Sequence, residues 1–132
     1  MITTTEIGDI LYRDCKVFNL PLQRRPIKVR KDEKLTRETI VILVKKQSSE
    51  KYWKKTFADI NFCIPDMRED IENTTRLGEL EKLANLHLDN VTSQFKETRY
   101  RYGIESVGIE ADTALKCHYV NLRILFEVLN TL

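Results

Sequence analysis

The stretch KTFADINFCIPD, Lys55–Asp66, indicates the fold more clearly than any other part of the chain. Its large apolar residues stand at every second position: Ile60, Phe62 and Ile64. Successive side chains of a strand point to opposite sides, so this alternation predicts a strand with one buried face. Pro65 cannot donate a hydrogen bond to a neighbouring strand, and we expect the strand to end there. Asp59 and Asn61 lie on the other face, which we expect either to meet a neighbouring molecule or to be an ordinary half-exposed surface.

Two hairpins are predicted. The run TIVILVKK, residues 39–46, is β-branched and continuously apolar, as in a central strand covered on both sides. With the strand that ends at Pro65 it predicts an antiparallel hairpin. Nearer the end of the chain, residues 98–110 and 115–129 flank the segment ADTA, which predicts the turn of a second hairpin.

Two helices complete the predicted domain. Thr3 and Glu6 have the spacing of a capping box, and apolar residues then recur every three or four positions up to Phe18. A second helix is expected within residues 70–95, with Thr74 or Thr75 as N-cap. Its predicted apolar stripe is long: Leu77, Leu80, Ala84, His87/Leu88, Val91 and Phe95. The predicted fold is therefore α+β, a single domain over residues 1–132 in the order α-ββ-α-ββ, with a mainly antiparallel four-stranded sheet packed with two helices.

Length and composition fit one globular domain. The chain has 132 residues, 42% hydrophobic and 32% charged. No apolar run approaches the roughly 20 residues that cross a bilayer, and the start lacks the profile of a signal peptide. Its cysteines, Cys15, Cys63 and Cys117, are odd in number and far apart. We therefore expect no disulfide framework and a reducing, cytoplasmic environment.

Charge is segregated along the chain. Residues 21–57 contain twelve Lys and Arg against four Asp and Glu, whereas residues 66–97 contain four against eight. Opposite charges on one domain can steer DNA or pair subunits head to tail. The alternative is a solvated surface whose charge is merely uneven.

No catalytic or metal-binding motif is evident. The cysteines and histidines show no close metal-binding pairs, and Cys117 and His118 are adjacent, so a strand would point them to opposite faces. The acidic pairs Glu69/Asp70 and Glu79/Glu81 fit a solvated helix, and no nucleophile elbow or phosphate-binding glycine loop occurs. We predict a protein that is not an enzyme, with no catalytic residue, metal or cofactor; an enzyme would need a pocket with converging polar groups.

Binding of nucleic acid is the alternative function. The segment QRRPIKVRKDEK, residues 23–34, is strongly basic, and the segments KYWKK and RYRY interleave cations with Tyr52, Trp53, Tyr100 and Tyr102. Basic grooves with aromatic platforms bind single strands by phosphate attraction and base stacking. The competing interpretation packs these aromatic rings on the sheet and leaves the cations in solvent.

The order of these elements resembles that of phage tail terminator, or tail-completion, proteins and related head–tail connector components. The resemblance covers nearly the whole chain, and its specific marks are DINFCIPD, residues 59–66, and the closing hairpin YGIESVGIEADTALKCHYVNLRILFEV, residues 102–128. It implies a non-enzymatic homo-oligomeric ring, commonly hexameric, that caps a tail tube and contacts other tail or connector proteins. It also implies a protein that is cytoplasmic during assembly and then part of the virion.

The resemblance supplies no catalytic residues, so the candidate site is a subunit interface or a surface facing DNA. The basic candidates precede the first hairpin: Arg24, Arg25, Lys28, Arg30 and Lys31. The acidic candidates belong to the second predicted helix: Glu79, Glu81 and Asp89. A ring lumen crossed by DNA would use the basic set equally well, because phosphate attraction needs no sequence readout.

Overall fold

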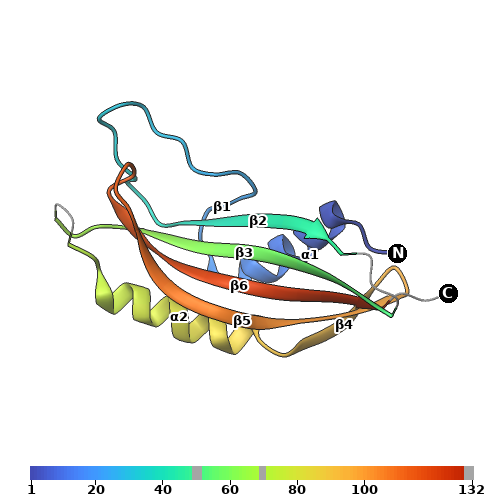
Figure 1. Cartoon of the computed structure of the whole chain (residues 1–132). Helices are drawn as coiled ribbons and strands as arrows, with labels where there is room; N and C mark the ends of the chain where they lie inside the picture. Colours follow the sequence, from blue (N-terminus) through green and yellow to red (C-terminus); the bar gives the residue numbers. More distant parts are fainter. Residues whose placement is uncertain (49–51, 69–70, 130–132) are drawn as a thin grey trace.

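The alternating stretch forms the long central strand β3 (Trp53–Pro65) of a curved sheet (Figure 1). In this computed structural model, residues 1–48, 52–68 and 71–129 are described. The remaining elements follow in chain order: α1 (Thr4–Cys15), the 3-10 helix η1 (Lys16–Phe18), β1 (Leu22–Gln23), β2 (Thr39–Gln47), α2 (Thr74–Leu88), β4 (Val91–Phe95), β5 (Thr98–Asp112) and β6 (Cys117–Leu129). The predicted loop segment QSSE and the pair Glu69/Asp70 lie wholly or partly outside the described residues.

The sheet has six strands in the order β1-β2-β3-β6-β5-β4. Strand β1 runs parallel to β2, and every other neighbouring pair is antiparallel. The two predicted hairpins, β2–β3 and β5–β6, are present, and β3 and β6 join them at the centre. The predicted four-stranded sheet in the order α-ββ-α-ββ is nevertheless wrong, because β1 and β4 extend it at both edges into a mixed sheet.

Strand β4 replaces the expected last turns of the second helix. Helix α2 ends at Leu88, and Asn90 adopts the left-handed region with φ 56°. Such a residue reverses the chain, and a tight turn at Lys96 and Glu97, both with positive φ, then pairs β4 with β5. Val91 and Phe95 still contact the core, as predicted, but from a strand.

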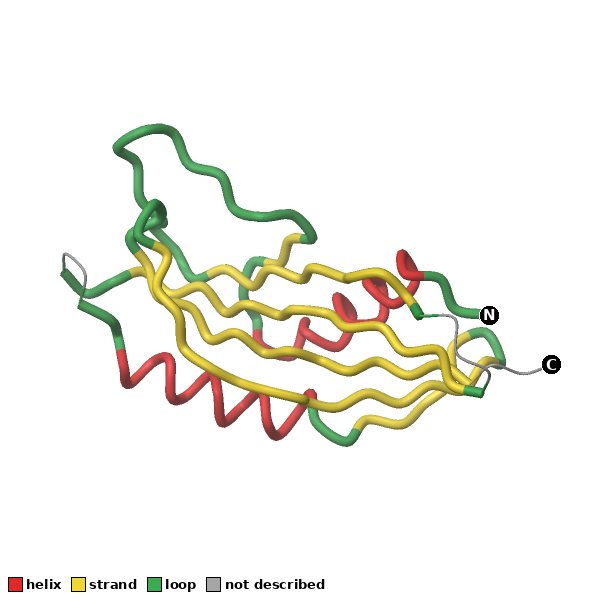
Figure 2. Tube along the Cα trace, viewed as in Figure 1, coloured by secondary structure: helices red, strands yellow, loops and turns green. Residues whose placement is uncertain are grey.

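Both helices pack against one face of the sheet (Figure 2). Ile60, Phe62 and Ile64 of β3 are all buried on that face, which confirms the predicted orientation of the strand. The predicted capping box is present as well, with Thr3 and Glu6 each accepting the other's backbone N–H. In α2 the N-cap is Asn73 rather than Thr74 or Thr75, since its side chain accepts the backbone N–H of Arg76.

The opposite face of the sheet carries a second, smaller apolar cluster. Residues 21–38, the basic connector, cross this face, and Leu35 packs there with Val41, Cys63 and Cys117. The sequence predicted that β2 is covered on both sides, and this is confirmed at its start. Neither described helix combines the length and apolar character needed to cross a membrane.

We expected the polar face of β3 to be open, but its side chains have partners on the neighbouring strands. Asn61 accepts a 2.7 Å hydrogen bond from Asn121 on the neighbouring strand, and Asp59 lies 3.7 Å from the ammonium of Lys45. These side chains are therefore satisfied within the sheet. Contact of these side chains with a neighbouring molecule stays a prediction, and within the chain their first partners are on the neighbouring strands.

Candidate interaction surfaces

The basic connector is anchored by its apolar residues. Ile27 and Val29 are partly buried against the second cluster, whereas Lys28 between them is exposed. Leu35 is buried, and its backbone N–H donates to the carbonyl of Leu115 at 2.9 Å. The connector thus reaches from the start of β2 to the tip of the β5–β6 hairpin, as Figure 1 shows.

Most cations of the connector project into solvent. Arg25, Lys28, Arg30 and Lys31 are exposed, and their side chains form no ion pair or hydrogen bond with any described residue. Sequence reasoning missed two further connector cations with the same properties, Lys34 and Arg37. The alternation of apolar and basic residues in PIKVRK, residues 26–31, indicates the exposure of Lys28 and Arg30, since one side of such a segment packs while the other stays in water, but it does not extend to Lys34 and Arg37.

Arg24 differs from the other predicted basic residues. Its guanidinium pairs with Asp9 and donates to the carbonyl of Thr5 at 2.8 Å. It lies directly over Gly8, where an added Cβ would come within 2.0 Å of Nη2. Arg24 therefore ties the connector to α1, and the missing side chain at Gly8 makes room for it. A charge reversal at Arg24 would disturb this contact before it tested any interface.

The acidic candidates lie on the helix side of the sheet, away from the connector cations. Glu79 pairs with Arg76 at 3.2 Å, and Glu81 is partly buried on α2. Asp89 accepts the backbone N–H of Ile104 at 2.9 Å and so fixes the end of α2 to a bulge in β5. One chain therefore does not bring the basic and acidic sets together; they occupy opposite sides of the molecule.

Arg76 connects the two sides. Its guanidinium forms hydrogen bonds of 2.8–3.0 Å to both carboxylate oxygens of Glu38, the last residue of the connector. The same side chain reaches Glu79. The bonds to Glu38 are the main cause that raises the pKa of Arg76. This anchor was not predicted, because the partners are far apart in sequence.

We expect Arg76→Met to lower the free energy of unfolding by about 1 kcal/mol, since the pair with Glu38 is bidentate but partly exposed. Arg76→Lys should lose part of that stability, because an ammonium cannot reproduce the two-pronged geometry. Urea denaturation measures both. Lys82→Met, at an exposed position of α2 with no ion pair to a described residue, is the control and should change stability little. Equal losses at both positions would contradict the anchoring role.

The aromatic platform predicted for nucleic acid is wrong for the segment RYRY, whereas Tyr52 of KYWKK is 65% exposed. Tyr100 and Tyr102 are 1% and 3% exposed and stack on Phe126, so they cannot receive bases. Arg101 covers the ring of Trp53, with its Cζ 4.1 Å from the ring centroid. The competing interpretation, in which the rings pack on the sheet and the cations face solvent, is confirmed for RYRY. The segment KYWKK begins outside the described residues.

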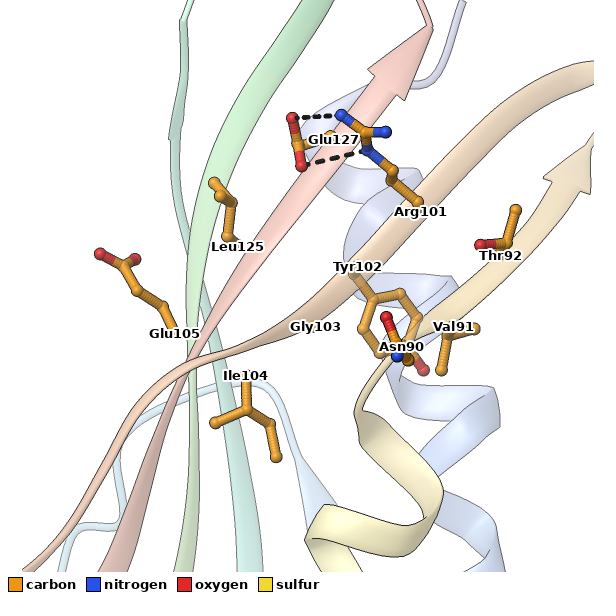
Figure 3. A pocket seen from close by; sticks show the side chains of 10 residues that line it. All are labelled: Asn90, Val91, Thr92, Arg101, Tyr102, Gly103, Ile104, Glu105, Leu125 and Glu127. Carbon is orange, nitrogen blue, oxygen red and sulfur yellow. Dashed lines mark hydrogen bonds and ion pairs between the residues drawn. The ribbon is translucent and has the colours of Figure 1, made fainter.

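A hollow of about 400 Å³ lies where β4 meets the bulged part of β5 (Figure 3). Its charged groups already have partners: Arg101 binds both carboxylate oxygens of Glu127 at 3.2 and 3.3 Å, and Glu105 lies 3.9 Å from Arg123. The charged groups are therefore already paired, and the uncharged polar side chains of the lining include Asn90 and Thr92, so the hollow offers little for recognition of a charged molecule.

The cysteines and His118 pack or form hydrogen bonds within the fold. Cys15 is in the main core, where burial raises the pKa of its thiol to about 12. The Cys117 thiol is hydrogen-bonded to the thiol of Cys63. This hydrogen bond, and then burial, raise the pKa of Cys117. His118 Nδ1 lies 2.7 Å from Asp66 Oδ1. Among residues 1–48, 52–68 and 71–129, no three His, Cys, Asp or Glu residues gather into a group able to hold a metal ion.

The chain matches no protein-family model, no curated protein and no solved structure.

Proposed function

We propose that this chain is a non-enzymatic structural subunit of a phage or prophage, of the tail terminator or head–tail connector type, which assembles into a ring. The observation that supports this most is a fixed connector with unpaired cations. Arg24, Leu35 and Glu38 fasten it to α1, the β5–β6 hairpin and α2. A segment held in place, most of whose cations have no partner among the described residues, is suited to binding an acidic surface of another molecule.

The chain supplies such a surface on its helix side. Glu79, Glu81 and Asp89 lie across the sheet from the connector, so a neighbouring copy can present them to Lys28, Arg30 and Lys31. Contacts between different surfaces of identical subunits are heterologous, and they form a closed ring when the rotation between copies permits. Other tail or connector proteins would then dock on the rim of that ring.

Binding of nucleic acid remains the second candidate, because the same unpaired cations attract phosphates. The support for it is mainly backbone attraction, since Tyr100 and Tyr102 are buried and, of the predicted stacking residues, Tyr52 is the exposed one. Such binding would be independent of sequence and strongly dependent on salt. A ring that surrounds DNA would combine both properties.

We expect light scattering after size exclusion to give a ring-sized species for the wild-type chain that grows with concentration and weakens with salt. The triple variant Lys28→Glu/Arg30→Glu/Lys31→Glu should weaken self-association by at least about tenfold, because three attractive contacts become repulsive. The matched control, Lys16→Glu/Lys82→Glu/Arg99→Glu, changes net charge equally at exposed positions outside the connector. It should assemble more nearly like the wild type.

Two results would contradict the proposal. If the connector variant assembles as well as the control, the connector cations are not an interface. If the wild type is monomeric at every concentration and binds DNA with an affinity that falls steeply with salt, the chain is instead a nucleic-acid-binding module.

A further inference from the structure

Strand β5 has a long open edge. Strand β4 pairs with β5 only between Thr98 and Tyr102, whereas residues 103–112 pair with β6 alone within the described part of the chain. Figure 1 shows this part of β5, in orange, at the border of the sheet. In an antiparallel pair, every second residue turns its N–H and C=O away from its partner. One of these outward groups, the N–H of Ile104, is bound by Asp89.

Open edges are usually protected against other strands by charged side chains, above all lysine, by proline, by bulges, by covering segments or by very short length. Residues 103–112 contain no lysine, arginine or proline. They carry two exposed apolar side chains, Val107 and Ile109, which are 40% and 44% exposed. A bulge lies between Ile104 and Ser106, and beyond it the register with β6 is regular. The segment from Ser106 onward is therefore a regular template for an additional strand.

The charge of this edge indicates which strand would be added. Its ionisable residues are all acidic: Glu105, Glu110 and Asp112. Pairing of β5 with β5 of another copy would bring these carboxylates toward one another, which is unfavourable. A basic strand is the better partner.

Strand β2 provides a basic edge at the other side of the sheet. Strand β1 pairs with β2 only at Ile40 and Val41, so Ile42, Leu43, Val44 and Gln47 pair with β3 alone among the described residues, and a bulge between Val44 and Gln47 takes Lys45 and Lys46 out of the register. This stretch combines apolar residues with Lys45 and Lys46, and Lys46 is exposed. The two open edges of one chain are thus complementary in charge and similar in apolar character.

We propose that the β5 edge of one copy, residues 103–112, pairs with the β2 edge of the next copy, residues 42–47. Strands β2, β3, β6 and β5 alternate in direction, so β2 and β5 point opposite ways. Successive copies are then related by a rotation about an axis parallel to the strands. This rotation keeps the helices of every copy on the same side of the extended sheet and makes β5 of one copy antiparallel to β2 of the next. This inference rests on the proposed ring and joins its subunits through sheet edges in place of the contact between the connector and the acidic residues of α2, because helices that all lie on one side keep those two surfaces apart.

The variant Val107→Lys/Ile109→Lys tests the β5 edge. It places two lysines at exposed positions of the β5 edge, where charged side chains oppose the addition of a strand, without removing a backbone bond to β6. We expect it to raise the concentration needed for assembly at least about tenfold, measured by light scattering. The matched control, Val17→Lys/Leu86→Lys, places lysine at two apolar positions that are 50% and 73% exposed outside this edge. Circular dichroism verifies that both variants fold.

A charge exchange tests the choice of partner. Lys46→Glu and Glu110→Lys should each weaken assembly as single variants. Mixed in equal amounts they should assemble again, because the lysine introduced on β5 of one variant then faces the glutamate introduced on β2 of the other. The second kind of junction in the mixture keeps the original pair, Lys46 with Glu110. Pairing of β5 with β5 would leave the single variant Lys46→Glu without effect on assembly, and that result would overturn the proposal.

These experiments distinguish failure of the proposed strand pairing from failure of the proposed ring. An assembled wild type together with edge variants that assemble like the control overturns the strand pairing and leaves the ring intact. A wild type that never assembles removes the ring, and the strand pairing with it. Loss in the edge variants with recovery on mixing supports both.

Discussion

Replacing Phe126 with alanine is expected to lower the free energy of unfolding by about 3–5 kcal/mol. Phe126 is fully buried on β6, and its ring stacks on Tyr100 and Tyr102 with centroid separations of 5.0 and 5.5 Å. Both tyrosine hydroxyls are hydrogen-bonded to residues of α1, Arg13 and Asp14. Because these bonds hold the tyrosines in place, the cavity left by the ring cannot collapse easily. Urea denaturation gives the loss directly.

Phe57→Ala is the matched control for Phe126→Ala. Phe57 lies on β3 at the opposite face of the sheet, where it is only partly buried and its ring lies under the guanidinium of Arg123, 4.3 Å from its centroid. Its removal should cost about 1 kcal/mol, the size of an exposed cation–π contact. Similar losses at the two positions would mean that the helix face does not hold the main core.

The sequence predicts most reliably those features that neighbouring residues determine. The alternation in β3 requires only that successive side chains of a strand point to opposite faces, and Ile60 and Phe62 are buried as expected. The capping box at Thr3 is also local, since both of its hydrogen bonds lie within one turn. These features were correctly predicted because no distant contact competes with them.

Features that depend on distant contacts were missed. Val91 and Phe95 continue the helical spacing of α2, but the left-handed Asn90 breaks the helix and β5 offers a paired edge instead. Strand β1 exists through its parallel contact with Ile40 and Val41 and has little pattern of its own. Short apolar spacing cannot distinguish a helix from an edge strand when the partner strand decides the outcome.

The candidate surface was predicted in part. Exposure of Lys28 and Arg30 follows from their alternation with apolar neighbours, which the sequence displays. The contact of Arg24 with α1 cannot be predicted from the sequence. It depends on Asp9 and on the missing side chain at Gly8, both of which only the fold brings near Arg24. Pairing of Glu38 with Arg76 is equally invisible in the sequence, and it fixes where the connector ends.

Asp14→Ala is expected to lower the free energy of unfolding by about 2–3 kcal/mol. The carboxylate of Asp14 accepts a 2.6 Å hydrogen bond from the hydroxyl of Tyr102, which is 3% exposed. Burial, and then this hydrogen bond, raise the pKa of Tyr102, so the phenol stays protonated and needs an acceptor. Alanine leaves that buried donor without one. Urea denaturation at neutral pH measures the effect.

Tyr102→Phe provides the control, because it removes the donor instead of the acceptor. The carboxylate left behind has 20% of its side chain exposed and keeps its contact with Arg13 at 3.0 Å, so water and that guanidinium still satisfy it. We therefore expect a smaller loss, about 1 kcal/mol. The double variant should resemble Tyr102→Phe, since no unsatisfied hydroxyl remains in it. If Tyr102→Phe proves the more damaging change, the tyrosine stabilises the fold mainly by its contact with other core groups, and Asp14 is an ordinary surface carboxylate.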